Sequence, residues 1–459
     1  MKTIYHLLYI IKLCFVILIL ISTLSCESFT TIDEPDSQLN SSVVFQDEKT
    51  ATAAMANIYL SKAILSGDQN GIGSILGLLT DELNCNTQNE SFLNFYTPNI
   101  ISSNKDILQL WNTTYNAIYQ CNAVIKGLDK SITLNEQFKD QLKGEALFMR
   151  SLYLFYLSEL FGDIPYVTTT NYTQNKQVKR LNKAGVYDLL ILDLQKAEEL
   201  LSLNYSSSLR IKPNKFAAQA LLARIFLYQQ NWSHAIEYST KLIDDSSFEI
   251  QTDLNQVFLK ENKSTIWQYQ SADKSNTQEG SYYIFSSAPP NLISLSNSLY
   301  ESFENSDQRK SHWIKSIDQG NKAWHHAYKY KQNGQTDSSK EFSIVFRLEE
   351  MYLIRSEAYA RLQVYDLSCN DLNTIRNRAG LPSIQINNQT ELLKAILQER
   401  QHELFLEHGH RFFDLRRFSE LDNTMFSIKN NWNTKYTLLP IPENEILLNP
   451  NLLPQNINY

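Results

Sequence analysis

Three glutamates near the C-terminus have a spacing that could support acid–base chemistry. Glu399, Glu403 and Glu407 stand four residues apart, so on a helix they would share one face. Glycosidases use paired carboxylates, but such a pair depends on its separation and on tuned pKa values. The arginines close by in the sequence are Arg400, Arg411, Arg416 and Arg417. Because a guanidinium matches a carboxylate in shape, this composition favours a buried or half-buried Arg–carboxylate network that holds the helix in place.

Histidines in the same stretch raise the question of a metal site. His402 begins a segment like the zinc motif H-E-x-x-H, but Leu406 occupies the place of the second histidine. His408 and His410 bracket a glycine expected to end a helix, which favours a capping or surface role. The chain has no G-x-S-x-G motif and no P-loop. We therefore predict no metal, no cofactor and no catalytic residue, and a protein that is not an enzyme.

Aromatic, amide and carboxylate side chains gather in two irregular segments, residues 66–104 and 245–330. Such side chains suit a sugar, because Tyr and Trp present a flat apolar body with a polar edge. The candidate ligand-binding residues are Asp81, Asn84, Phe92, Phe95, Tyr96, Trp267, Tyr269, Tyr282, Tyr283, Trp313 and Trp324. The alternative for each aromatic is that it belongs to the local core.

Helices in pairs must position these segments. After Asn182, a predicted N-cap, apolar residues follow at helical spacing as far as Leu201. Residues 213–244 predict a helix, a turn at 229–231 and a second helix, which is the geometry of a tetratricopeptide repeat. Further helical hairpins are predicted at 105–161 and 347–378.

Between residues 245 and 346 the helical pattern is lost. Only brief alternation occurs, around Ile266–Gln270 and Tyr282–Phe285. Because the segment is rich in aromatic residues, we interpret it as a folded, loop-rich insertion with short strands rather than as disorder. Residues 66–104 receive the same interpretation.

The N-terminus indicates export. An apolar stretch from Leu13 to Ile21 is too short to remain as a membrane-spanning helix and is typical of a signal peptide, here residues 1–25. Small residues then lead to Cys26, which resembles the acylated cysteine of bacterial lipoproteins, although Thr23 stands where leucine is usual. Residues 26–45 would then be the lipidated cysteine and a polar tether. An ordinary secreted protein is the alternative.

Composition excludes several classes of protein. The formal charge of −7 becomes about −9 once the two signal-peptide lysines are removed, and a nucleic-acid partner would require a basic face instead. Cys85, Cys121 and Cys369 remain in the mature chain, widely spaced and in no C-x-x-C arrangement. This predicts buried thiols, with at most one disulfide and no zinc site.

The C-terminal third carries sequence blocks that resemble a known family. The blocks are Arg347–Ala358, Asn373–Pro382, Glu399–Leu404, His410–Arg417, Leu439–Pro442 and Asn449–Leu452, with Ala146–Val167 and Asn214–Ile243 upstream. Together they look like the signature of the SusD/RagB family, and the likeness covers almost the whole mature chain. Asp307 and Arg309 resemble a further element of that family, which we interpret as structural.

The resemblance implies a mainly α fold: a tetratricopeptide-like scaffold of helical pairs with a loop-rich ligand-binding region. It implies a lipoprotein of the outer membrane that faces the cell exterior and lies as a lid on a SusC-like TonB-dependent transporter barrel. The expected ligand is an oligosaccharide or other glycan. Capture of a peptide or another nutrient on the same fold is the alternative, and an extracellular hydrolase is a distant one.

The domain organisation follows from these expectations. Residues 46–244 form the N-terminal half, 245–346 the loop-rich insertion and 347–459 the C-terminal half. We expect all three to fold as one globular unit.

Overall fold

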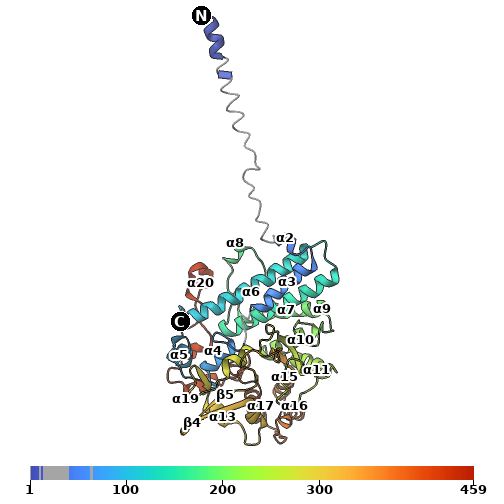
Figure 1. Cartoon of the computed structure of the whole chain (residues 1–459), viewed down its shortest axis with the longest axis vertical. Helices are drawn as coiled ribbons and strands as arrows, with labels where there is room; N and C mark the ends of the chain where they lie inside the picture. The colour runs from blue at the N-terminus through green and yellow to red at the C-terminus, as the bar shows by residue number, and fades with distance from the viewer. Residues whose placement is uncertain (1, 10–11, 14–40, 62–65) are drawn as a thin grey trace. The chain divides into compact units, whose positions relative to one another are not determined.

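The computed structural model describes residues 2–9, 12–13, 41–61 and 66–459 (Figure 1). The chain divides into two units, Met1–Val44, which holds α2 (Ser41–Val44), and Phe45–Tyr459. Cys26 and most of the predicted signal peptide and tether lie outside the described residues. In the described part of the chain, no helix has both the length and the apolar character needed to cross a bilayer.

Long helices packed in chain order form the scaffold of the second unit. These helices are α6 (Lys105–Lys130), α7 (Glu136–Phe161), α9 (Lys183–Leu200), α10 (Lys215–Tyr228), α11 (Trp232–Ile243), α15 (Leu348–Arg361), α16 (Tyr365–Arg378) and α17 (Gln389–Leu404). From α6 to α16 each helix packs against the next, and α17 packs against α15. The predicted hairpins at 105–161, 213–244 and 347–378 are confirmed, as is the mainly α fold.

Asparagine side chains begin most of these helices. The side chain of Asn182 accepts a hydrogen bond from the Gly185 backbone N–H, so the predicted N-cap is confirmed. The other asparagine N-caps of long helices are Asn104, Asn135, Asn214, Asn231 and Asn388. Gly162 ends α7 with a φ of 75°, a conformation that a residue with a Cβ adopts only with strain. Local capping therefore sets the length of the scaffold helices.

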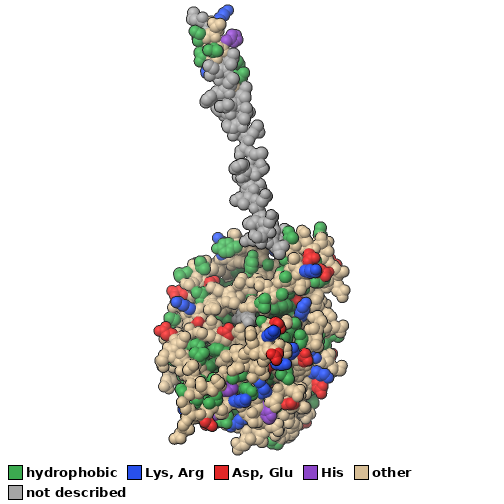
Figure 2. Space-filling view, in the orientation of Figure 1, with side chains coloured by type: hydrophobic (Ala, Val, Ile, Leu, Met, Phe, Trp, Pro, Cys, Tyr) green, Lys and Arg blue, Asp and Glu red, His purple; other side chains and the backbone are tan. Residues whose placement is uncertain are grey.

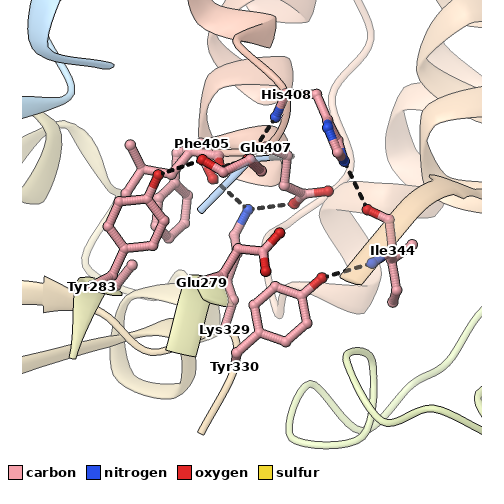
Figure 3. Close-up of a pocket in the computed structure, with 11 residues that line it drawn as sticks. Glu279, Tyr283, Lys329, Tyr330, Ile344, Phe405, Glu407 and His408 are labelled. Carbon is pink, nitrogen blue, oxygen red and sulfur yellow. Dashed lines mark hydrogen bonds and ion pairs between the residues drawn. The ribbon is translucent and has the colours of Figure 1, made fainter. Parts of the chain in front are cut away.

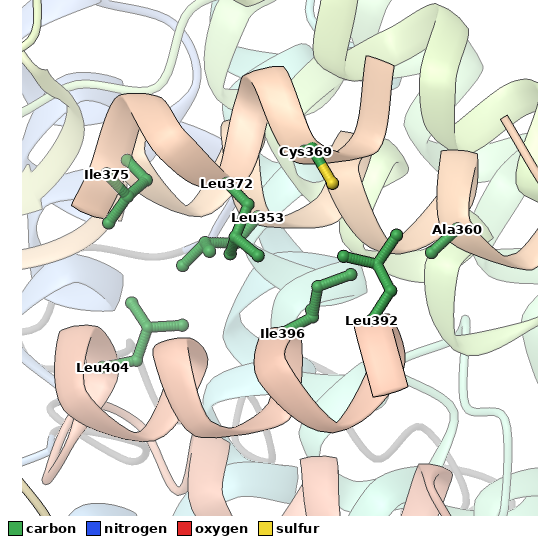
Figure 4. Packing of buried hydrophobic residues seen from close by; sticks show 8 residues of the cluster. All are labelled: Leu353, Ala360, Cys369, Leu372, Ile375, Leu392, Ile396 and Leu404. Carbon is green, nitrogen blue, oxygen red and sulfur yellow. The ribbon is translucent and has the colours of Figure 1, made fainter. Parts of the chain in front are cut away.

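Apolar side chains from α15, α16 and α17 meet in one of the cores (Figure 4). Leu353 and Ala360 come from α15, and Ile396 from α17. The remaining members of this cluster are Cys369, Leu372, Ile375, Leu392 and Leu404. All are buried, which fixes the C-terminal helices as one packed layer.

The loop-rich segment lies between two helices that touch each other, because α11 and α15 pack together although about 100 residues separate them. Its elements are β2 (Thr265–Tyr269), α12 (Gln278–Tyr283), β3 (Ile293–Leu295), α13 (Asn297–Ser302), α14 (Gln308–Trp313), β4 (Ile314–Gln319), β5 (Lys322–Ala327) and β6 (Ser343–Arg347). The alternation at 266–270 predicted β2 correctly. The alternation at 282–285 does not form a strand, because α12 reaches Tyr283.

Two antiparallel sheets organise this region. One joins β2 to β6, and the other has the order β1-β3-β5-β4. Strand β1 (Leu83–Cys85) comes from the first irregular segment, so this sheet joins residues 66–104 to the insertion. That segment is also more regular than predicted, because it contains α4 (Ile72–Leu79), with all eight residues buried, and α5 (Glu90–Tyr96).

Shorter elements complete the unit. They are α3 (Glu48–Leu60), α8 (Tyr172–Asn175), α18 (His410–Arg417), α19 (Leu421–Ile428), α20 (Glu443–Leu448) and the 3-10 turns η2 (Thr434–Thr437) and η3 (Pro450–Leu452). The cysteines Cys85, Cys121 and Cys369 are free. The prediction of buried thiols is confirmed for Cys121 and Cys369 and wrong for Cys85, which is half-buried.

Candidate functional site

The three glutamates of α17 lie in a buried ionic network. Glu403 pairs with Arg309, Arg347 and Arg378, and its side chain has no exposed surface. Burial alone would raise the pKa of Glu403, but the charges of Arg378, Arg347 and Arg309 hold it well below its usual range. A carboxylate enclosed in this way is not accessible to a substrate, so its role is structural.

The neighbouring glutamates extend this network. Glu407 pairs with Arg347 at 2.9 Å and with Lys329, while Glu399 pairs with Arg309 at 2.7 Å. Arg309 also binds Asp307, the residue that caps α14. The predicted Arg–carboxylate network is therefore present, and Asp307 and Arg309 are structural. Its arginines come from distant segments rather than from the neighbours named from the sequence.

Those neighbouring arginines pair elsewhere. Arg400 binds Asp414, and Arg417 binds both Asp414 and Glu357. The two other neighbours, Arg411 and Arg416, bind Asp81 and Glu159 respectively. Several separate buried ion pairs thus hold α17 and α18 against the rest of the unit.

The histidines of this region are buried, so the expected capping or surface role was wrong. His402 stacks on Phe303 with ring centroids 4.3 Å apart, and burial lowers its pKa to about 3. The ring of His408 lies near the backbone oxygen of Ile344, 2.9 Å from Nε2. Burial also lowers the pKa of His410 well below its usual value. Among the described residues, no group of three metal-ligating side chains is present.

A small cavity borders the ionic network (Figure 3). Its volume is about 20 Å³, which is room for a single water molecule and far too small for a sugar. Lys329 lines the cavity and donates hydrogen bonds to the carbonyls of Glu403 and Phe405 and to the carboxylate of Glu407. Burial raises the pKa of the lining residue Glu279 to about 7. This cavity belongs to the structural core.

Two of the tryptophans proposed as ligand platforms lie in the core. Trp267 and Trp313 have no exposed surface, and their indole N–H groups donate to the carbonyls of Ile211 and Leu254. Trp267 lies on β2, whose five residues are all buried, and packs edge-on against Phe148. A side chain with no exposed surface cannot stack on a ligand, so both predictions are corrected.

Five further candidates are also buried. Phe92 and Phe95 are the buried residues of α5. Tyr283 donates its hydroxyl to the carbonyl of Ser66, and Tyr269 is 6% exposed. The carboxylate of Asp81 is occupied by the guanidinium of Arg411 at 2.6 and 2.9 Å. These contacts give all five a role in the core or in an ion pair.

The remaining candidates, Asn84, Tyr96, Tyr282 and Trp324, are half-buried. The Tyr96 hydroxyl lies 3.5 Å from the side-chain oxygen of Asn84, which brings α5 and β1 together. Tyr282 approaches α4 through its hydroxyl, 3.0 Å from the Ser74 hydroxyl. Trp324 lies on β5 opposite Ile317.

The register of the sheet decides which side chains share a face. Cross-strand partners point to the same side and successive residues alternate. Leu83, Leu295 and His325 form one row, and Leu83 faces α4, where it lies close to Gly77. The opposite side is here called the polar sheet face, and its residues are Asn84, Ser294, Lys315, Ile317, Lys322, Trp324 and His326. One amide, two lysines and an aromatic ring therefore lie on one side of the sheet, together with Ser294 and His326, which are buried.

Other side chains at this face were missed by sequence reasoning. Asn86 donates to the Ser294 hydroxyl, and Phe285 packs edge-on against His326 at 4.9 Å. The lysines Lys315 and Lys322 belong to the hairpin formed by β4 and β5. One signal could have revealed the hairpin: Gly320-Asn321, a two-residue turn between two strand-length segments.

A second hollow, of about 330 Å³, lies beside α3. It is lined by Met55, Tyr59, Tyr269 and Gln270 among others, so Tyr269 contributes to it with the small part of its surface that is exposed. Its lining mixes apolar side chains with a few polar ones.

Comparison with known proteins accounts for both the fold and the sequence blocks. Residues 33–227 match a SusD-like family described as starch-binding and associating with the outer membrane, and residues 314–459 match the SusD family. This chain belongs to the SusD/RagB family. It is 23% identical to SusD-like protein P25 of Formosa agariphila, over 95% of this chain and 96% of that protein.

Solved SusD structures share the fold. A SusD superfamily protein from Bacteroides vulgatus superposes with a TM-score of 0.79 at 22% identity, covering 90% of this chain and 99% of that one. A laminarin-binding SusD-like protein gives 0.75 at 20% identity, over 90% of this chain and all of the other. The family predicted from the sequence blocks is therefore confirmed.

Proposed function

We propose that this SusD/RagB protein binds glycans at the cell surface without turning them over. Family membership over both halves of the chain carries the proposal. A similar structure is a laminarin-binding protein, and another is a surface glycan-binding protein from Bacteroides thetaiotaomicron. The α17 carboxylates, which offered the main catalytic alternative, are fully engaged in buried ion pairs.

The polar sheet face is the proposed binding surface. An indole ring, two amides and a tyrosine at its edge supply what a sugar requires, an apolar platform bordered by hydrogen-bonding groups. Trp324 would provide the platform, while Asn84 and Asn86 would bind hydroxyl groups. Tyr96 lies beside Asn84 and would extend this surface. Tyr282 contacts Ser74 of α4, the helix that the opposite side of the sheet faces.

Calorimetric titration of the mature chain with a panel of oligosaccharides and peptides tests the function. We expect at least one glycan to bind and none of the ligands to be cleaved, as measured by product analysis after long incubation. If only peptides bound, the proposed ligand would be a peptide and not a glycan. Release of cleaved products by the purified chain would overturn the non-enzymatic proposal.

The binding surface has its own test. Trp324→Ala and Tyr96→Ala should each weaken glycan binding by roughly tenfold or less, since an aromatic contact contributes about 0.5–1.5 kcal/mol beyond the area it buries. Tyr119→Ala is the matched control, because Tyr119 is 49% exposed on α6. Unchanged affinity in both variants, with unchanged melting temperature, would place the ligand elsewhere, first of all in the hollow beside α3.

Delivery to a transporter is a further part of the proposal. We propose that the chain works with a SusC-like TonB-dependent barrel in the outer membrane, and family membership is the support for this. Native membranes solubilised in mild detergent should yield a large barrel protein together with the tagged chain. Repeated purification without a barrel would count against this partner.

A further inference from the structure

The β4–β5 hairpin carries a charge opposite to that of the whole chain. The protein has a net charge of −7. Residues 308–331 nevertheless contain six basic residues and a single carboxylate, Asp318. Two of the basic residues, Arg309 and Lys329, are buried in the ionic network. The others, Lys310, Lys315, Lys322 and Lys331, reach the surface.

Three of these lysines lie over aromatic rings at the polar sheet face. The ammonium of Lys322 is 3.8 Å from the centre of the Trp324 ring. Lys315 and Lys331 approach the same ring, that of Tyr328, at 3.7 and 4.5 Å. The register places Lys315, Lys322 and Trp324 on one side of the sheet, so the charges and the indole face in the same direction.

None of these three ammonium groups has a carboxylate partner within the described part of the chain. Other lysines, among them Lys139, Lys143, Lys183, Lys196, Lys241 and Lys263, do pair with a carboxylate. Burial lowers the pKa of Lys331 to about 8; attraction by Glu341 opposes this shift, while the nearby charge of Lys315 adds to it. Lys315 and Lys322 of the hairpin, with Lys331 shortly after it, thus gather positive charge with no ion-pair partner among the described residues.

Charged side chains of both signs are interspersed over the face of the molecule drawn in Figure 2. On an acidic protein, a negatively charged polymer is repelled by most of the surface, and over distances beyond about 10 Å the salt of the medium screens this repulsion. A local cluster of unpaired lysines would therefore decide where such a polymer binds.

We infer that the polar sheet face is selective for anionic glycans, that is, oligosaccharides whose sugars carry carboxylate or sulfate groups. This inference rests on the proposed function and names the ligand class of the same surface. A pyranose ring would stack on Trp324, and the ammonium of Lys322 would move from the indole to the anionic group of the sugar. Lys315 would bind the next anionic group along the chain, with Asn84 on a neighbouring hydroxyl.

Pairs of probes that differ only in charge test the inference. Oligogalacturonate is compared with the same oligomer after methyl esterification, and chondroitin sulfate with its desulfated form, by calorimetric titration against the full mature chain. We expect the charged member of at least one pair to bind more tightly, by roughly threefold to thirtyfold for two or more surface ion pairs. The preference should shrink as salt concentration rises.

Lysine variants then locate the effect. Lys315→Ala combined with Lys322→Ala should remove most of the preference, whereas Lys315→Arg with Lys322→Arg should retain it. Lys394→Ala is the matched control, since Lys394 is exposed on α17 and has no ion pair among the described residues. Because Lys315, Lys322 and Lys394 are exposed, the melting temperatures of all these variants should stay within a degree or two of the parent.

The outcomes separate the inference from the proposed function. Equal binding of charged and neutral partners would overturn the inference and leave glycan capture intact. A preference that survives the double alanine variant would also overturn it. Failure of every glycan to bind would count against the proposed function itself. Lysine-dependent binding of poly-glutamate but of no glycan would assign the surface to acidic peptides instead.

Discussion

Glu403 is the residue at which the most distant parts of the chain meet. Its carboxylate contacts Arg309 of α14, Arg347 of β6 and Arg378 of α16, so one side chain of α17 binds three other elements. Glu403→Gln keeps the shape of the side chain but removes the negative charge that three buried guanidinium groups share. We expect a loss of about 3–5 kcal/mol in the free energy of unfolding, measured with denaturant.

Glu391→Gln is the control for this measurement, because Glu391 is exposed in the first turn of the same helix. It should change stability by no more than about 0.5 kcal/mol. If Glu403→Gln cost no more than this control, the network would not be a source of stability.

Glu82 gives the protein a stability that falls with rising pH. Burial, assisted by the charge of Asp81, raises its pKa to about 8, and the Leu406 N–H donates to its carboxyl oxygen. Between pH 4.5, the ordinary pKa of a glutamate, and about pH 8, the folded protein therefore keeps a proton that the unfolded chain has released. Across this window the free energy of unfolding declines by about 1.4 kcal/mol per pH unit for such a group.

Glu82→Gln removes this titration and keeps an oxygen for the Leu406 N–H. We expect the melting temperature of the variant, relative to that of the parent protein, to rise at each step from pH 5 through 6 and 7 to 8. A constant difference between the two proteins over this range would contradict the raised pKa. Glu279 also has a raised pKa, and it titrates in both proteins. The difference in melting temperature between the variant and the parent removes this shared contribution.

Residue types alone predicted the ionic network better than the ligand surface. Three glutamates on one buried helical face require positively charged partners, and this much could be predicted. Which arginines pair with them depends on tertiary contacts between distant segments, which the sequence does not show. The aromatics were harder, because Trp267 and Trp324 both lie on short strands. Trp267 lies on β2, which pairs with β6 and has all five residues buried. Trp324 belongs to a hairpin that reaches the surface.

At the scale of elements, the long helices were predictable and the strands were not. Helical periodicity repeats over several turns, and caps such as Asn182 mark where it begins. The strands have three to six residues, too few for an alternation to stand out, and β2 is buried on both faces. The helix α4 was missed because its eight residues span only about two turns, too short for a helical period to stand out from the sequence.

Gly409 lies where α18 packs closely against α4. Gly409 begins α18 with a φ of 73°, and a Cβ there would lie 2.4 Å from Leu76 of α4. Gly409→Ala therefore adds backbone strain to a steric overlap and should lower the free energy of unfolding by about 1–3 kcal/mol. Gly334→Ala is the control, because a Cβ at Gly334 would have no atom within 4 Å. Equal melting temperatures for the two variants would show that α4 and α18 can separate at no cost.

At the scale of the whole molecule, the helical scaffold and the proposed ligand surface lie on different parts of the chain. The helices from α6 to α16 pack in chain order, and the insertion leaves this array after α11 and returns to it at α15. Sequence changes within the hairpin need not disturb the helical core, whereas the buried pairs of α17 hold the insertion to the scaffold. This division would let one fold accept many ligands.

The predicted lipid anchor would decide where the proposed binding surface can act. Cys26 follows an apolar stretch of signal-peptide length and lies outside the described residues. Acyl chains contribute about 0.8 kcal/mol per buried CH₂, so an acylated cysteine with several chains would hold the protein on the membrane. Cys26→Ser should abolish labelling by a fatty-acid probe and move the protein from the membrane fraction to the soluble fraction. The glycan affinity of the released protein should not change, because the ligand surface begins near Asn84 in the other unit. Undiminished labelling of the variant would show that the protein is not anchored through this residue.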